Sequence, residues 1–243
     1  MGGMFVIVQA RMTSTRLPGK VLMDLGGRSV LAHTLARCAA IPGIDGVCCA
    51  VPDGSVHDPV AAEADGSGFT VFRGSEHDVL DRYWRAAKAL MADVVMRVTS
   101  DCPLIDPEVC GRVLHLVTRG GYDYSCNDMP PTWPHGLDCE AFTFDTLDRA
   151  VEEASTPQQR EHVTPWMRVD LTVKRANLPG PGGWTAEQRW TLDYPEDLEF
   201  LRAVFAELKP WPAIPTMNDV LHLLKNRSEL LMLNVIRRHS RSK

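Results

Sequence analysis

An apolar run that leads directly into a cationic loop constrains this chain more than any other feature. Residues 5–8 (Phe-Val-Ile-Val) are all apolar and mostly β-branched, which is typical of a strand buried on both faces. The loop that follows holds Arg11, Arg16 and Lys20, with hydroxyl side chains and Gly19 between them. Because an unpaired buried charge is very costly, these cations must face water, a carboxylate or an anionic ligand.

The position of this loop predicts a nucleotide site. In α/β proteins, nucleotides bind at the carboxyl ends of the strands. Hydroxyl groups and a glycine suit a loop whose backbone N–H groups approach phosphate oxygens. The loop is not a Walker motif, because Lys20 is followed by Val21 and not by Ser or Thr. The alternative interpretation is a basic loop that is simply solvated.

Charge and composition narrow the kind of ligand. The net charge of the chain is −5 at pH 7, so positive charge is local to this loop. This balance predicts a small phosphorylated ligand and excludes nucleic acid and membrane surfaces as expected partners. The seven cysteines are scattered without a CxxC pair, which predicts reduced thiols and a cytoplasmic protein. The basic residues 237–243 predict a solvated tail.

Strand-like and helix-like segments alternate along the chain. We expect strands at residues 5–8, 44–51, 69–72, 93–98, 122–126, 137–142, 171–178 and 188–192. We expect helices at residues 30–38, 58–64, 78–90, 108–118, 144–154, 195–208, 217–224 and 229–237, the last two against the sheet edge. The order predicts an α/β fold with a mostly parallel sheet flanked by helices. We expect one domain over residues 1–243, with a smaller mixed region at about residues 122–183.

Two aspartates stand in equivalent positions. Asp101 and Asp193 each follow an expected strand and precede a proline by two residues. The chain should therefore leave the sheet at the same edge at both points, beside the cationic loop. Mg²⁺ takes one or two carboxylates together with substrate phosphates, so these residues are candidate ligands. Carboxylates on opposite sides of the sheet, or more than about 8 Å apart, would exclude a shared ion.

Other charged residues leave two interpretations open. Arg82 lies near the start of an expected helix, where it either contacts a ligand or is solvated. Asp138 and Glu140 share one face of an expected strand, facing either sugar hydroxyls and cations or solvent. Arg160 and His162 are candidate sugar-pocket or subunit-contact residues, and the chemistry does not require the histidine as a proton carrier.

Several of these segments resemble one known family. They are the loop at residues 9–20, Asp81-Arg82, Asp101-Cys102-Pro103, residues 136–142 and residues 193–199. They are similar to the sugar-activating cytidylyltransferases, which are the CMP-KDO and CMP-acylneuraminate synthetases and, most closely, the SpsF-type proteins of surface polysaccharide pathways. The resemblance implies a nucleotide-diphospho-sugar transferase (GT-A-like) fold and a homodimer. It implies a reaction in which CTP and an acidic sugar give a CMP-sugar and pyrophosphate, with Mg²⁺ as cofactor.

The resemblance also implies roles for individual residues. The catalytic residues would be Arg11, Lys20 and Asp101. The nucleotide contacts would come from Gln9, Ala10, Arg11, Ser14, Arg16, Lys20, Arg82 and Thr99. The sugar contacts would come from Asp138, Glu140, Arg160 and His162, and the metal contacts from Asp101 and Asp193. Thr99 departs from the CMP-KDO synthetases, which carry a base-reading glutamine there. The sugar hydroxyl would attack the α-phosphorus directly, so no enzyme nucleophile is required.

Three alternatives remain at this stage. The first is a nucleotidyltransferase with another base or acceptor, and the second is a GT-A glycosyltransferase, which usually carries an Asp-x-Asp pair. The third is a catalytically silent binding subunit. The apolar, proline-rich residues 129–134 favour a homodimer with residues 122–183 at the interface. We also expect that Lys20→Ala weakens nucleotide binding with almost no change in melting temperature.

Overall fold

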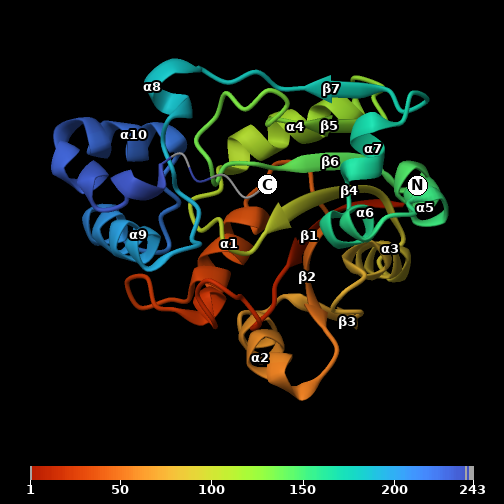
Figure 1. The fold of residues 1–243 in the computed structure, drawn as a ribbon, viewed down its shortest axis with the longest axis horizontal. Helices are drawn as coiled ribbons and strands as arrows, with labels where there is room; N and C mark the ends of the chain where they lie inside the picture. The colour runs from red at the N-terminus through yellow and green to blue at the C-terminus, as the bar shows by residue number, and fades with distance from the viewer. Residues whose placement is uncertain (1, 239, 241–243) are drawn as a thin grey trace.

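A seven-stranded sheet of order β3-β2-β1-β4-β6-β5-β7 forms the centre of the structure, a computed structural model that describes residues 2–238 and 240 (Figure 1). The strands are β1 (Gly3–Gln9), β2 (Gly46–Pro52), β3 (Thr70–Gly74), β4 (Ala92–Thr99), β5 (Tyr124–Cys126), β6 (Glu140–Thr143) and β7 (Arg175–Asn177). The predicted α/β class and mostly parallel sheet are confirmed.

The central strand β1 aligns the two loops that matter most. It pairs in parallel with β2 on one side and β4 on the other, and Gln9 lies opposite Thr99 in the register. The chain therefore leaves β1 and β4 side by side at the same sheet edge. Among the strands of the described chain, β6 alone runs in the opposite direction, because it is antiparallel to both β4 and β5, while β3 is parallel to β2 and β7 is parallel to β5.

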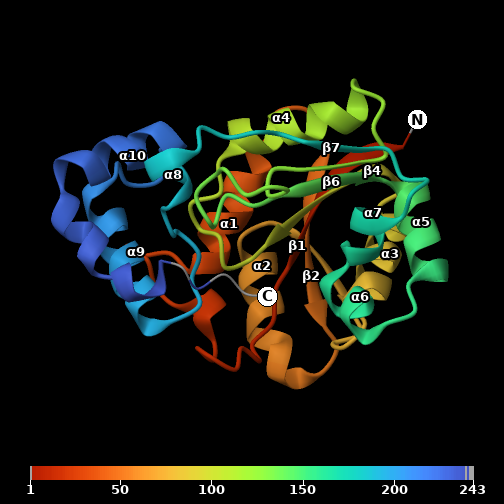
Figure 2. The same ribbon diagram turned by 45° about the horizontal axis from the view of Figure 1, so that its top comes forward.

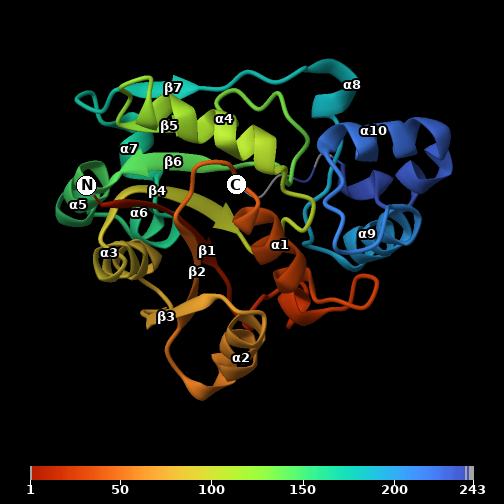
Figure 3. The same cartoon turned by 180° about the vertical axis from the view of Figure 1, so that it is seen from behind.

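Helices cover both faces of the sheet, and this explains the unbroken apolar run in β1. One face carries α1 (Val30–Ala39), α2 (Asp58–Gly66) and α4 (Pro107–Thr118). The other carries α3 (Val79–Ala89), α5 (Phe144–Glu153), α6 (Pro157–His162) and α7 (Pro165–Val169) (Figures 1 and 3). Val6 and Val8 pack into the first core, while Ile7 packs into the second. Helices thus exclude water from both faces of the strand at residues 6–8, which explains why these residues are all apolar.

The last helices form a third layer beyond the sheet. They are α8 (Gly183–Ala186), α9 (Pro195–Glu207) and α10 (Met217–Asn226), followed by the 3-10 turns Ser228–Met232 and Val235–Arg237. Figure 2 shows them grouped to one side of the strands. Their core includes Leu25, Trp190 and Leu192 but no residue of a named strand within the described chain. The prediction that they pack on a sheet edge is therefore wrong.

Four other element predictions are also wrong, in whole or in part. Residues 188–192 form only an isolated bridge, between Arg189 and His135, and residues 229–237 form short 3-10 turns instead of a helix. Only Arg175–Asn177 of residues 171–178 is a strand, and β6 begins at Glu140, after Asp138. In residues 188–192 the apolar side chains are buried against α9 and α10, so burial there has a cause other than sheet formation.

The cysteines and termini complete the comparison with the sequence. All seven cysteines are buried free thiols, as predicted, and Cys48 and Cys49 lie in the core. No helix among the described residues has the length and apolar character needed to cross a membrane. Arg237 forms an ion pair with Glu196, while the predicted solvated tail at residues 239 and 241–243 lies outside the described residues.

Candidate active site

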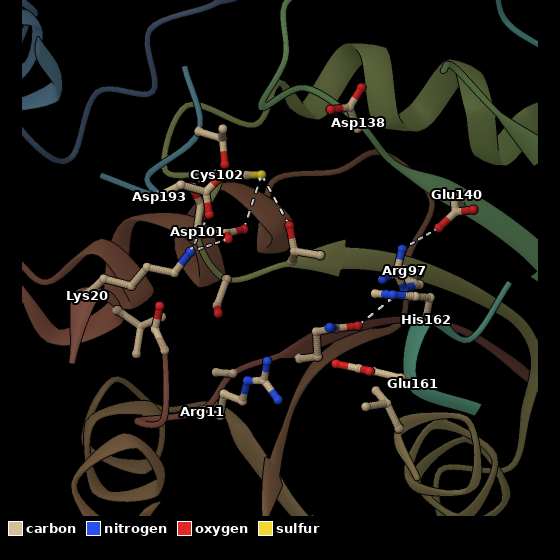
Figure 4. Close-up of a pocket in the computed structure, with 18 of the residues that line it drawn as sticks. Arg11, Lys20, Arg97, Asp101, Cys102, Asp138, Glu140, Glu161, His162 and Asp193 are labelled. Atoms are coloured by element: carbon tan, nitrogen blue, oxygen red, sulfur yellow. Dashed lines mark hydrogen bonds and ion pairs between the residues drawn. The ribbon is translucent and has the colours of Figure 1, made fainter. Parts of the chain in front are cut away.

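A cavity of about 400 Å³ lies at the edge of the sheet where β1 and β4 end (Figure 4). Its walls come from the loop after β1, the start of α3, the loop after β4, and segments near β6 and α6. The predicted site residues that line it are Gln9, Ala10, Arg11, Ser14, Arg16, Lys20, Arg82, Thr99, Asp101, Asp138, Glu140, His162 and Asp193. The fold thus collects side chains from widely separated parts of the sequence.

Lys20 and two aspartates form the most tightly connected group in the cavity. The Nζ atom of Lys20 lies 2.7 Å from Oδ2 of Asp101 and 3.0 Å from Oδ1 of Asp193. It also donates to the backbone carbonyl of Leu192 at 2.6 Å. Because both carboxylates contact one nitrogen, they lie on the same side of the sheet and within reach of a single cation.

The electrostatics keep all three groups charged. Burial alone would lower the pKa of Lys20, but Asp101 and Asp193 raise it above its ordinary value. Burial alone would raise the pKa of Asp101, but Lys20 lowers it to about 2. The pKa of Asp193 is likewise lowered against burial, by Lys20 and Arg16. At neutral pH the group is therefore an ammonium between two carboxylates.

Asp193 is held more rigidly than its partner. Arg16 contacts its Oδ1 at 2.6 Å, and buried Arg189 contacts its Oδ2 at 3.0 Å. Asp197, which is fully buried, forms an ion pair with Arg189 and accepts hydrogen bonds from the backbone N–H groups of Asp193 and Tyr194. The start of α9 thereby supports the aspartate.

The donor set permits a divalent cation only if the substrate contributes ligands. Among the described residues, no group of three or more His, Cys, Asp or Glu side chains is placed to hold a metal. Asp101 and Asp193 supply two carboxylates, and Lys20 occupies the position between them. Two carboxylates with phosphate oxygens and water suit Mg²⁺, so these residues fit such an ion in the presence of a nucleotide.

Two arginines of the cavity lack a carboxylate partner. Neither Arg11 nor Arg82 forms an ion pair with any residue of the described chain, yet both line the cavity. Arg82 is buried, donates to the carbonyl of Ser75, and keeps a buried Nε without a hydrogen-bond partner. Burial lowers the pKa of Arg82. The solvated interpretation of Arg82 is therefore wrong, and these two cations favour an anionic ligand.

Glu140 organises the opposite end of the cavity. Its carboxylate is buried and accepts from Arg97 at 2.5 Å and from Arg168 at 2.6 Å. Tyr124 and Thr164 donate to the same carboxylate, at 2.5 Å and 2.7 Å. The solvent interpretation of Glu140 is wrong, because the side chain is buried and protein donors contact both oxygens, while a sugar contact by Glu140 stays a prediction. Glu140 instead positions two arginines along the cavity wall.

The remaining predicted residues separate into two groups. Asp138 and His162 line the cavity, whereas Arg160 is not among its lining residues. Arg160 pairs with Asp78, the N-cap residue of α3, and thereby ties α6 to α3. The geometry gives no support to a sugar contact by Arg160, which stays a prediction.

Sequence reasoning did not identify the arginines that Glu140 positions. Arg97 is a charged residue within the apolar stretch at residues 94–98 of β4, a signal that could have marked it. Arg168 lies in the short helix α7 and pairs with Asp128 as well as Glu140, and its local sequence carries no such signal.

Comparison with known proteins identifies the class. The profile of the cytidylyltransferase family matches residues 5–209. The chain therefore belongs to the cytidylyltransferase family, a class of nucleotidyl-transferring enzymes. It is 33% identical over 235 residues to the spore coat polysaccharide biosynthesis protein SpsF of Bacillus subtilis (strain 168), covering 93% of this chain and 96% of SpsF.

Other relatives match shorter stretches. The uncharacterized protein MJ1063 of Methanocaldococcus jannaschii is 37% identical over 161 residues, which is 66% of this chain and 65% of that protein. The 3-deoxy-manno-octulosonate cytidylyltransferase of Anaeromyxobacter sp. (strain Fw109-5) is 36% identical over 117 residues, which is 47% of each chain. The chain thus matches about half the length of the latter.

Solved structures confirm the nucleotide-sugar transferase fold. A cytidylyltransferase from Leptospira borgpetersenii superposes with a TM-score of 0.88 and 28% identity, covering 95% of this chain and 97% of that one. A CMP:2-keto-3-deoxy-manno-octonic acid synthetase in complex with CTP gives 0.65 at 18% identity, with 85% and 99% covered. Rv0371c from Mycobacterium tuberculosis in complex with manganese gives 0.56 at 14% identity, with 83% and 98% covered.

The Glu140 group predicts a specific dependence of stability on pH. The folded pKa of Glu140 is about 2, against an ordinary value of 4.5, so the carboxylate stabilises the fold above pH 4.5 and this contribution is lost as the pH falls toward 2. Glu140→Gln should lower the free energy of unfolding by about 3 kcal/mol at neutral pH. Urea unfolding of both proteins should show this difference shrinking below pH 4.5. A difference that stays constant down to pH 2 would contradict the ion-pair account.

Lys20 is expected to matter for stability, contrary to the sequence-based expectation of an almost unchanged melting temperature. Lys20→Met would leave Asp101 and Asp193 facing each other without their shared cation. Removing one partner of a buried ion pair costs about 3–5 kcal/mol. Thermal unfolding should therefore show a clearly lower melting temperature for this variant. The double variant Lys20→Met/Asp101→Asn should recover most of the lost melting temperature. An unchanged melting temperature in the single variant would contradict this geometry.

Proposed function

We propose that this protein couples CTP to an acidic sugar, releasing pyrophosphate and forming a CMP-sugar for a surface polysaccharide. The observation that carries the proposal is the pair of cavity arginines, Arg11 and Arg82, without carboxylate partners in the described chain, beside the two carboxylates of Asp101 and Asp193. The similarity to SpsF supports the polysaccharide role. The similarity to a 3-deoxy-manno-octulosonate cytidylyltransferase supports CTP and an acidic sugar.

The nucleotide would occupy the end of the cavity near the loop after β1. Arg11, Arg16 and Lys20 bring positive charge to this end, where the triphosphate would lie. Arg82 and Thr99 stand on the walls beside Gln9, close to where the base would bind. Arginine is well suited to this task, since its donors match phosphate oxygens and its plane can stack on a base.

The acidic sugar would occupy the end organised by Glu140. Arg97 and Arg168 face the cavity there and could receive the sugar carboxylate in the bidentate geometry that guanidinium groups favour. Asp138 and Glu161 offer acceptors for sugar hydroxyls. The two ends of the cavity would then place the sugar hydroxyl next to the α-phosphorus.

Catalysis would come from position and charge. In such phosphoryl transfers the protein mainly aligns the attacking oxygen and stabilises the developing charge. Asp101 and Asp193 would hold a divalent cation such as Mg²⁺, which neutralises charge on the phosphates. Arg11 and Lys20 would act on the same oxygens, and buried Arg189 would keep Asp193 in place.

The proposal also includes a cytoplasmic location and a homodimeric assembly. Seven buried free thiols suit the reducing cytoplasm, where nucleotide sugars are made. A homodimer with residues 122–183 at the interface remains our expectation. Within the segment that suggested it, Met129 is exposed, while Trp133 is buried in its own chain.

A pyrophosphate-release screen tests the proposed reaction. The protein would be offered CTP, UTP, ATP and GTP with Mg²⁺ against a panel of acidic sugars and their carboxamide counterparts. We expect release with CTP and an acidic sugar, and weak release with its carboxamide. Release only with another nucleotide, or only with uncharged sugars, would contradict the proposal.

Two variants separate chemistry from folding in this screen. Asp101→Asn keeps the shape of the side chain and removes its charge, so turnover should fall by at least about a thousandfold while the circular dichroism spectrum is unchanged. Asp65→Asn removes an exposed carboxylate on α2, outside the cavity, and should have no effect. Comparable turnover in the wild-type protein and in both variants would show that Asp101 has no role in the reaction.

A further inference from the structure

The cationic loop is closed around the backbone of one residue, Met12. The carbonyl of Met12 accepts from the backbone N–H of Ser14 at 2.9 Å and from that of Gly19 at 3.1 Å. Gly19 has a φ of 70°, which favours glycine, and Lys20 follows it directly. The orientation of the backbone at Met12 therefore governs the path of the loop from Arg11 to Lys20.

The backbone N–H of Met12, which belongs to the preceding peptide group, is bound by a residue from elsewhere in the fold. It donates to Nδ1 of His57 at 3.2 Å. His57 lies in the turn between β2 and α2 and is fully buried. It is not among the residues that line the cavity, so it touches the loop from behind.

A second contact connects the far side of the imidazole to the loop. The Nε2 of His57 lies 3.5 Å from Oε2 of Glu76, at the long limit of a hydrogen bond, and finds no closer partner in the described structure. The other oxygen of Glu76 accepts from the hydroxyl of Thr13 at 2.5 Å. His57 and Glu76 together hold two successive residues of the loop.

This geometry determines the form of the histidine. A backbone N–H can only donate, so Nδ1 of His57 must carry no proton. The ring is therefore neutral, with its proton on Nε2, pointing toward the carboxylate of Glu76. An apolar side chain at this position would leave the N–H of Met12 without an acceptor.

We propose that His57 is a positioning residue for the cationic loop: its neutral imidazole, whose Nε2 faces Glu76, holds the backbone of Met12 in the arrangement that presents Arg11 and Lys20 to the ligand. Its effect on nucleotide affinity rests on the proposed function. Its effect on the loop does not, because the contacts belong to the free protein.

Three substitutions at and near this position test the idea. His57→Leu removes the acceptor for Met12, whereas His57→Asn can place a side-chain oxygen close to the position of Nδ1. His33→Leu is the matched control, since His33 is another buried histidine, whose Nε2 contacts the carbonyl of Leu25 away from the loop. Melting temperatures would report how far each substitution disturbs the fold as a whole.

Two measurements on the free protein examine the loop itself. The ¹⁵N chemical shifts of the imidazole should identify the neutral ring with its proton on Nε2. Hydrogen exchange should show that His57→Leu speeds amide exchange across residues 10–20 by about tenfold. His57→Asn should restore much of the protection, and His33→Leu should leave it unchanged. A proton on Nδ1, or unchanged exchange in His57→Leu, would overturn the proposal.

Nucleotide binding then gives the functional consequence. The Kd for CTP, measured by calorimetry, should rise about tenfold in His57→Leu and recover in His57→Asn, because fewer molecules hold the competent loop. If amide exchange in the loop of His57→Leu is faster but its Kd for CTP is unchanged, the positioning role is overturned. If the wild-type protein binds no CTP while the loop results hold, the proposed function fails and the structural role of His57 stands.

Discussion

The contact of one ammonium group with two carboxylates determines how the site is assembled. Lys20 comes from the loop after β1, Asp101 from the loop after β4, and Asp193 from the segment before α9. These segments lie far apart in the sequence, and only the sheet and the C-terminal helices bring them together. Since an unpaired buried charge is so costly, Lys20 requires a carboxylate partner and Asp101 requires Lys20, while Asp193 is paired with Arg16 and Arg189 as well. The same cluster of charge makes the site suitable for phosphates and a divalent cation.

Buried arginine–carboxylate pairs likewise hold charged side chains in place at both ends of the cavity. Arg189 and Asp197 are both fully buried and support Asp193 from behind. Glu140, equally hidden, sets the positions of Arg97 and Arg168. In each case a buried charged group orients side chains that line the cavity. Arg11 and Arg82 differ, since no described carboxylate pairs with either, and this makes them the strongest sign of an anionic ligand.

Much of the site could be predicted from sequence, because its residues lie just beyond strands with clear patterns. Apolar runs located β1 and β4, and parallel strands end at a common edge, so the loop cations and Asp101 were placed correctly. Asp193 was placed correctly for a partly wrong reason, because residues 188–192 do not form a strand. Burial of apolar residues against helices resembles burial in a sheet, and a short segment does not distinguish the two.

Other features depend on contacts between distant segments, which local patterns do not contain. The role of Glu140 follows from four donors on separate elements, and the alternation of side chains along a strand could not reveal them. Arg160 was expected among the sugar contacts, and in the structure it pairs with Asp78 on α3. His57 carried no signal, because its function in the loop exists only where the turn after β2 meets Met12.

A crystal structure with CTP and Mg²⁺ would test the central claim most directly. The account predicts the triphosphate against Arg11 and Lys20, the metal between Asp101 and Asp193, and open space beside Arg97 and Arg168 for the sugar. Triphosphate bound outside this cavity, or a metal held by other residues, would contradict it.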